Sequence, residues 1–243
     1  MEILERFFWF VVLIALAALF FSLFSCSGNE SRERTLYQGM GQAYVMITAA
    51  QSNYTLAGAK AFRDSLPSIN ALFKAASVME QIHKNGVINA FSAFDRSDNL
   101  SPKKQAELSK EYSLSQYDTI SNIRKYFVGQ PLIFSMNTSR VNLNSCMKMQ
   151  SFMINDLFLS LSDEANNVGS EYMKELYFMY MESEQSAYRL FSDAYKYFSN
   201  ASQFTTKYGV CPKCGSIYIY DDGTTDCGVC GVNSSKFIIV DAD

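Results

Sequence analysis

Two pairs of cysteines near the C-terminus constrain this chain more than any other feature. Cys211 and Cys214 form one C-x-x-C pair, Cys227 and Cys230 form a second, and twelve residues separate the two pairs. A glycine follows each pair, which allows the backbone to turn sharply and aim amide N–H groups at the sulfur atoms. Four soft thiolates at this spacing are typical of a tetrahedral zinc or iron site, whereas two disulfides fit the short spacers less well. The sequence therefore predicts a four-cysteine metal domain.

The metal itself is not decided by this pattern. Apolar and aromatic residues surround the cysteine pairs in the sequence: Tyr208, Ile217, Tyr218, Ile219, Tyr220, Phe237, Ile238 and Ile239. An apolar shell limits solvent access and suits an iron that transfers electrons, but the same residues would form the small core of a zinc ribbon. The pattern is therefore compatible with either one iron ion or one zinc ion at the four cysteines.

A long apolar segment at the N-terminus predicts membrane attachment. Residues 7–24 are apolar except for Ser22, and at about 1.5 Å per residue they would span about 27 Å as a helix, close to the thickness of a bilayer core. One interpretation is an uncleaved membrane helix. The other is a lipoprotein signal, with Cys26 as the lipidated residue. We expect residues 1–26 to be the anchor or signal, followed by a polar spacer at 27–34.

The two interpretations place the rest of the protein on opposite sides of the membrane. Arg32 and Arg34 follow the apolar segment, and Glu2 and Glu5 precede it. This distribution of charge favours a cytoplasmic domain if the helix is uncleaved. Lipidation at Cys26 would instead place the domain outside the cytoplasm.

Charge and histidine content exclude two classes of function. The net charge is −3 and no basic run is present, so the composition gives no electrostatic support for binding nucleic acid. His83 is the single histidine of the chain, which excludes sites that need several imidazoles.

The central part of the chain has the pattern of a mainly helical protein. Apolar residues recur at helical spacing over four long segments, which are 35–64, 67–94, 140–166 and 170–199. Two short links join these segments in pairs, and a long connection, 95–139, joins the pairs. It contains a possible short helix at 102–112. Two helical hairpins with a long crossover predict a ferritin-like four-helix bundle over 35–204, followed by the metal domain over 205–243.

One motif inside the predicted bundle has the spacing of a metal site. Glu80 and His83 form an E-x-x-H pair, and residues at positions i and i+3 share one face of a helix, so both side chains can reach the same ion. The pair is short enough to occur by chance, and a hydrogen-bonded histidine on a half-buried helix is the simpler interpretation.

Taken together, these motifs resemble rubrerythrin. The resemblance covers about 34–240 and rests on the order of the parts, a bundle followed by C-P-x-C-G and C-x-x-C-G with twelve residues between the pairs and then Lys236-Phe237 and a short apolar strand. It implies a ferritin-like bundle with a di-iron centre that reduces hydrogen peroxide. It also implies a rubredoxin-like iron–tetrathiolate centre through which electrons arrive.

The bundle departs from the pattern that the resemblance implies. The glutamate of the first helix falls on Gln51, the E-x-x-E of the third helix falls on Gln150 and Met153, and the final E-x-x-H falls on Glu184 and Ala187. Glu80, His83 and Glu184 remain, and two carboxylates cannot neutralise the four positive charges of two Fe²⁺ ions. We therefore expect no normal di-iron site.

Two alternatives remain for the bundle interior. Either a buried polar network or a single metal would use the same residues: Gln51, Glu80, His83, Gln150 and Glu184. The sequence does not identify catalytic residues.

Three functions follow from these expectations. The first is a membrane-anchored, rubrerythrin-like protein that transfers electrons through an iron–tetrathiolate centre. The second is a peroxide reductase with a rebuilt bundle metal site, and the third is a module in which zinc has a structural role only. The expected partners are the membrane, an unidentified redox protein and a second copy of the chain docked through the bundle.

Overall fold

The structure is a computed structural model that describes residues 35–94, 138–221 and 223–242. The predicted membrane anchor at 1–26, its lipidation residue Cys26, the spacer at 27–34 and the possible short helix at 102–112 lie outside the described residues. Within the described part of the chain, no helix is both long and apolar enough to span a bilayer.

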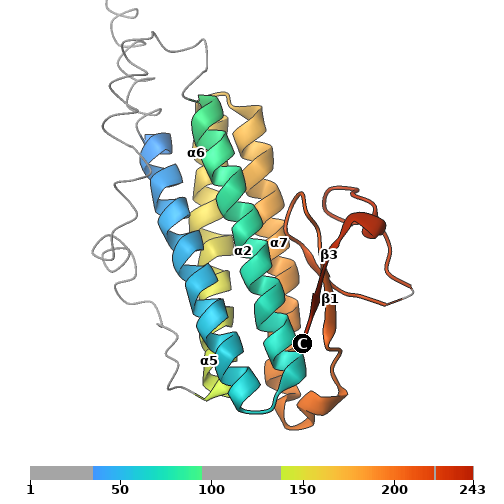
Figure 1. The fold of residues 1–243 in the computed structure, drawn as a ribbon. Coiled ribbons are helices and arrows are strands. Elements are labelled where there is room, and N and C mark those ends of the chain that lie inside the picture. The colour runs from blue at the N-terminus through green and yellow to red at the C-terminus, as the bar shows by residue number, and fades with distance from the viewer. Residues whose placement is uncertain (1–34, 95–137, 222, 243) are drawn as a thin grey trace, which may run out of the picture.

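Four long helices lie side by side and a small sheet packs against one side of them (Figure 1). The first helix covers residues 35–63. The second, α2, is Pro67–Phe94, and the last, α7, is Glu171–Lys196. The third consists of three consecutive pieces, namely α5 (Ser139–Phe152), the π-helix η2 (Met153–Phe158) and α6 (Leu159–Asn167). The expectation of a mainly helical chain with a small C-terminal strand region is confirmed.

Each helix turns an apolar stripe toward the centre of the bundle. In α2 and α7 the buried positions recur every three or four residues, as a helix with one buried face requires. The core-facing residues of these two helices include Ile69, Leu72, Phe73, Ala76, Met79, Met173, Leu176, Tyr177, Tyr180, Ala187 and Phe191. Three buried polar residues, Glu80, His83 and Glu184, interrupt the stripes at one level of the bundle.

The two tight turns of the bundle have local causes. Between the first helix and α2, Ser65 adopts a left-handed backbone with φ of 57°, and Pro67 begins the next helix, where its missing N–H is not needed. Between α6 and α7, Gly169 has φ of 74°. Its N–H donates to Asn166 O, and Ser170 N donates to Ala165 O, which satisfies two carbonyls at the helix end.

The π-helix in the third helix was not expected from the sequence. It begins at Met153, and the side-chain amide of Asn155 donates to Ser151 O at 2.8 Å. In an α-helix, that carbonyl would accept the backbone N–H of Asn155, so the side chain competes with the backbone for the same acceptor. The result is a wider turn that begins at Met153, after the end of α5.

The C-terminal region is a three-stranded antiparallel sheet with two short 3-10 helices. Its elements are η3 (Phe198–Gln203), β1 (Lys207–Val210), β2 (Ile217–Ile219), η4 (Ser234–Lys236) and β3 (Ile238–Asp241). The strand order is β2-β1-β3, with Tyr208 paired to Ile219 on one side and to Val240 on the other.

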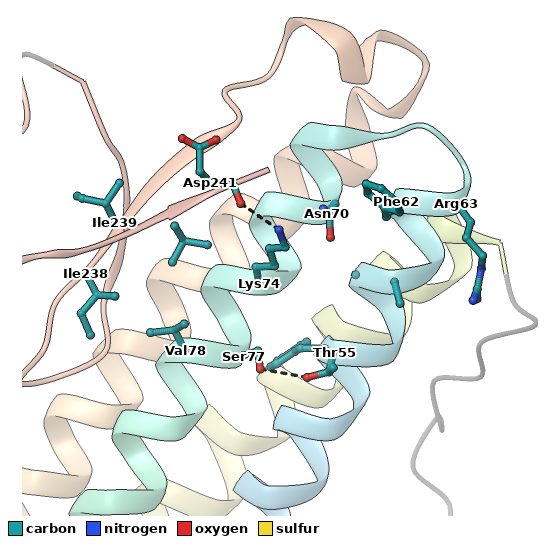
Figure 2. A pocket seen from close by; sticks show the side chains of 14 residues that line it. Thr55, Phe62, Arg63, Asn70, Lys74, Ser77, Val78, Ile238, Ile239 and Asp241 are labelled. Carbon is teal, nitrogen blue, oxygen red and sulfur yellow. Dashed lines mark hydrogen bonds between the residues drawn. The ribbon is translucent and has the colours of Figure 1, made fainter. Parts of the chain in front are cut away.

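The sheet is fixed to the bundle by polar contacts as well as by packing. Ile217 N of β2 donates to Ser186 Oγ of α7 at 3.1 Å, and Asn70 Nδ2 of α2 donates to Ala242 O at 3.1 Å. Lys74 also reaches the end of β3, where its Nζ lies 3.4 Å from Asp241 O (Figure 2). These contacts hold the cysteine domain beside the middle of α2 and α7.

An open groove of about 890 Å³ lies between the first helix, α2 and β3. Figure 2 shows Ile238 and Ile239 on its β3 side and Phe62 near the end of the first helix. No described cysteine lines this groove, so it is separate from the four-cysteine site.

Candidate metal sites

The four predicted cysteines come together at one point of the C-terminal domain. Their sulfur atoms all lie within 4.8 Å of one another. The Sγ atoms of Cys211 and Cys230 are 3.4 Å apart, as are those of Cys214 and Cys227. These separations are too long for disulfides of about 2.05 Å. They are close to the edge of about 3.8 Å for a tetrahedron with metal–sulfur bonds of about 2.3 Å. The four thiols therefore fit a single tetrahedral metal.

Each cysteine pair lies on a turn with the same hydrogen bonds. In the first turn, Cys211 N donates to Ser216 O, and Gly215 N donates to Cys211 O. In the second, Cys227 N donates to Val232 O and Gly231 N donates to Cys227 O. The two glycines have φ of 85° and 70°, which L-residues with side chains rarely adopt.

These turns show which backbone amides face the sulfurs. The glycine amides donate to cysteine carbonyls rather than to sulfurs. For the second cysteine of each pair, the N–H group that lowers the thiol pKa belongs to the residue that follows the glycine, Ser216 for Cys214 and Val232 for Cys230. The glycine bends the chain, and the next amide then faces the sulfur.

The thiols strongly affect one another. A hydrogen bond from the Cys214 thiol, together with the N–H groups of Cys214 and Lys213, lowers the pKa of Cys211 to about 5. The Cys211 thiolate and burial raise the pKa of Cys214 far above its usual value. One thiolate therefore forms readily and opposes the next. Four thiolates can coexist only around a cation, as at a metal site.

Part of the expected apolar shell packs against this site and part does not. Phe237 is buried beside the cysteines, and Tyr218 stacks on it with ring centroids 5.3 Å apart. The Tyr218 hydroxyl lies 3.3 Å from Cys227 Sγ and accepts from Gly228 N. Ile238 and Ile239 are instead about 40% exposed, at 41% and 42%, so they do not shield the sulfurs.

A second candidate site lies inside the bundle. Glu80 and His83 of α2 and Glu184 of α7 are all completely buried, and their potential ligand atoms lie within 4.8 Å of one another. His83 Nδ1 is 3.4 Å from Glu80 Oε2 and 3.2 Å from Glu184 Oε1. The short E-x-x-H motif therefore does face a buried carboxylate from another helix.

The other nitrogen of His83 connects the two sites. Its Nε2 lies 3.0 Å from Cys214 O and 3.2 Å from Ser183 Oγ. A carbonyl oxygen can only accept a hydrogen bond. Nε2 of His83 therefore carries the hydrogen and donates a hydrogen bond to Cys214 O. The ring thus contacts a cysteine of the metal domain with one nitrogen and the buried acids with the other.

The pKa values of Glu80 and His83 indicate that the negative charge of the buried bundle group must be balanced by protons or by a cation. Burial and the charge of Glu184 raise the pKa of Glu80 to about 8. Burial lowers the pKa of His83, but hydrogen bonds to Glu184 and Glu80 outweigh burial and raise the pKa to about 9. Without a metal, protons on Glu80 and His83 must compensate the buried negative charge.

The two glutamines predicted for the bundle site are placed differently from the acids and the histidine. Gln51 is half-buried in the first helix, and its amide donates to Gln81 Oε1 at 2.9 Å rather than to an acid of the buried group. Gln150 is fully buried, and its amide has no hydrogen-bond partner among the described residues. Asp156 is an acidic residue of the third helix that could have taken the place of a missing ligand. It is exposed in the π-helix, so it does not replace Gln150 as a buried ligand.

Four residues near these sites were missed by the sequence interpretation. Tyr54 lies beside Gln150, and burial together with the charges of Glu184 and Glu80 raises the pKa of its hydroxyl well above the usual value. Burial raises the pKa of the Cys146 thiol, and the charge of Glu80 raises it further. The others are Ser183, which contacts His83, and Tyr180, which packs on His83 with ring centroids 4.2 Å apart. Helical spacing places Tyr54 one turn beyond Ala50 and Gln51, and this was the signal that could have identified it.

Among the described residues of the bundle, few charged ligands are available for a second ion. The positions that would supply the second ion with charged ligands hold Gln150, Met153 and Ala187, and all three are buried. The acids and the histidine that do converge are Glu80, Glu184 and His83. Two carboxylates balance one divalent cation, not two.

Comparisons with known proteins support the fold. No family profile and no curated protein sequence matches the chain. Among solved structures it is similar to nigerythrin, in the partially reduced state at 18% identity and a TM-score of 0.64. It is also similar to the mixed-valence state and to the fully reduced, all-ferrous state, each at 17% identity and a TM-score of 0.63. Each match covers 84% of this chain and 86% of the other.

Identity at this level shows the fold alone. The match extends over both the bundle and the C-terminal domain, and the four cysteines converge as a rubredoxin-like site requires. The resemblance to rubrerythrins is therefore confirmed for the fold: the chain folds as nigerythrin does, with a ferritin-like bundle followed by a rubredoxin-like four-cysteine domain.

Proposed function

We propose that this chain is a membrane-anchored, iron-binding redox protein that passes single electrons through its four-cysteine centre. The convergence of four thiols and the likeness to nigerythrin support iron. The solved structures of nigerythrin are in partially reduced, mixed-valence and all-ferrous states, which are states of a redox protein. Zinc is the alternative metal, and it would make the domain structural.

The observation that carries this proposal is the contact between His83 Nε2 and Cys214 O. Iron held by the four cysteines supplies reversible one-electron chemistry. The chain's own residues position the neighbouring site: Ser183 and Cys214 O fix the His83 ring, and the other nitrogen of that ring faces Glu80 and Glu184. The His83 side chain thus contacts the backbone of a cysteine of the metal domain with one nitrogen and the buried acids with the other.

Reversible colour change tests this proposal. The full-length chain loaded with iron should show ferric-thiolate absorption that dithionite bleaches and ferricyanide restores. The Cys214→Ser variant should lack the absorption. A chain that binds iron at these cysteines but cannot be reduced and reoxidised would contradict electron transfer as its function.

A second candidate function is peroxide reduction, favoured by the buried group of Glu80, His83 and Glu184 beside the cysteine domain. We infer slow turnover at best, because the ligands of a normal two-iron site are incomplete. Mixing the reduced chain with peroxide in a stopped-flow instrument distinguishes the two functions. Rapid reoxidation in the parent chain and slow reoxidation in His83→Gln would establish the peroxidase.

Membrane attachment is part of this proposal. The apolar segment at 7–24 supports it, and deletion of 1–26 should release a folded protein from membranes. Incorporation of a labelled fatty acid that Cys26→Ala abolishes would assign a lipoprotein outside the cytoplasm. Retention without the label would assign an uncleaved helix and a cytoplasmic domain.

The proposed partners are an unidentified redox protein and a second copy of the chain. The reasons are the need for an electron source and the two-hairpin bundle, which offers helices for a dimer contact. Sedimentation of the 1–26 deletion variant distinguishes monomer from dimer. The net charge of −3 gives no electrostatic support for a nucleic-acid partner.

A further inference from the structure

The geometry points to one new site: the bundle binds a single divalent cation, such as Mn²⁺ or Fe²⁺, through Glu80, His83 and Glu184. Two of these side chains come from α2 and the third from α7, and all three are completely buried. The inference goes beyond the proposed electron transfer and does not depend on it, because the four-cysteine domain could hold iron or zinc with the bundle unchanged.

The unpaired atoms of this group point toward a ligand. All four carboxylate oxygens of Glu80 and Glu184 are buried without a hydrogen-bond partner, apart from their ion pairs with His83. Buried carboxylates without partners are costly, since they have lost water and gained nothing in return. A cation among them removes that cost.

His83 is already oriented as a ligand. Its Nε2 is held by Cys214 O at 3.0 Å, which leaves Nδ1 to face the two carboxylates. Metal-binding histidines commonly donate their second nitrogen to a carbonyl in this way, which fixes the ring and its tautomer. Gly215 makes the close approach possible, because a Cβ there would lie 2.8 Å from Nε2.

The surroundings limit the site to one ion. Gln150 offers only neutral atoms, Met153 and Ala187 offer no charged ligand, and Gln51 is bonded to Gln81 outside the group. The charge of two carboxylates equals that of one divalent cation, and a second cation would remain uncompensated in the interior.

The ligand set also indicates which metals fit. Carboxylate oxygens suit Mn²⁺, and an imidazole suits Fe²⁺. Soft Cu⁺ prefers thiolates, so it would go to the four cysteines. The two sites of this chain therefore differ in ligand chemistry as well as in number of donors.

Manganese binding to the full-length chain tests the inference. We expect saturation at one Mn²⁺ per chain and an electron paramagnetic resonance spectrum of an isolated ion, without the multiline pattern of a coupled pair. His83→Gln and Glu184→Gln should weaken binding about 100-fold or more, since loss of outer partners alone costs about 10- to 100-fold. Glu175→Gln, an exposed change in the same helix, should leave binding intact.

Two results would overturn the inference. Two bound ions per chain with a coupled spectrum would mean that further residues complete a two-metal site. Binding no tighter in the parent chain than in His83→Gln would mean that protons alone balance the acids. Far-ultraviolet circular dichroism reports folding of the helical bundle in every variant, so a misfolded variant is recognised and the stoichiometry of the parent chain decides.

Discussion

The two candidate metal sites are built in opposite ways. The four cysteines lie within a span of 19 positions, and hydrogen bonds inside two short turns hold each of them. The bundle group joins residues about a hundred positions apart, and only the packing of α2 against α7 brings them together. A local site depends on a few residues and is either present or absent. A site made by packing can lose single ligands to Gln, Met or Ala while the helices stay folded.

Removing a cysteine ligand should have the largest effect. Cys227→Ser should abolish metal binding at the four-cysteine site, since structural sites of this type contribute roughly 10 kcal/mol or more to the folding of small domains. Residues 205–242 should then lose protection from hydrogen exchange while the helices keep theirs. Cys146→Ala, which removes a bundle thiol, is the control. Loss of metal in the control, or its retention in Cys227→Ser, would break the comparison.

Gly215 and Gly231, the glycines that follow the two cysteine pairs, offer a sharper test of the contact between the cysteine domain and the bundle. Gly215→Ala and Gly231→Ala both force a left-handed backbone onto alanine, which costs about 1–2 kcal/mol. Only the first also pushes a Cβ to 2.8 Å from His83 Nε2, and such overpacking costs about 1–3 kcal/mol. Denaturant unfolding should therefore show Gly215→Ala as the less stable variant. Equal destabilisation would contradict the contact between the domain and the bundle.

A smaller effect should follow from loosening the same interface away from either metal site. Ser186→Ala removes the acceptor of Ile217 N, a loss of about 1 kcal/mol. Hydrogen exchange at Ile217 should accelerate while metal binding is unchanged. Unchanged exchange would mean that packing alone holds β2 on α7.

The smallest effect should come from the end of the bundle where the first helix meets α5. Ser139 Oγ donates to Asp64 Oδ2 at 2.7 Å and, after Lys60, lowers the pKa of Asp64. A lowered pKa stabilises the fold above the unfolded value of about 3.9, and the contribution is lost as the pH falls through the folded value. Ser139→Ala should cost under about 1 kcal/mol at neutral pH and reduce the loss of stability upon acidification. An unchanged pH profile would show that Lys60 alone controls Asp64.

Local patterns account for what could be predicted from the sequence. Helical spacing predicted four helices close to those observed, and the C-x-x-C pairs predicted the convergence of Cys211, Cys214, Cys227 and Cys230. Both features depend on neighbours within a few residues, so one sequence contains the required information.

Tertiary packing accounts for what could not be predicted. Helical spacing cannot tell that Gln51 faces Gln81 while Tyr54 faces the buried acids, because both lie within one turn of the same helix. The bond from His83 to Cys214 joins residues 131 positions apart, and nothing in either local sequence indicates it.

Iron content of anaerobically purified full-length chain, combined with electron paramagnetic resonance, tests the central claim most directly. The account predicts one iron per chain at the four cysteines, with a high-spin ferric signal that disappears on reduction and returns on reoxidation. Stoichiometric zinc with no iron would contradict it, and the domain would then be a structural module attached to the bundle.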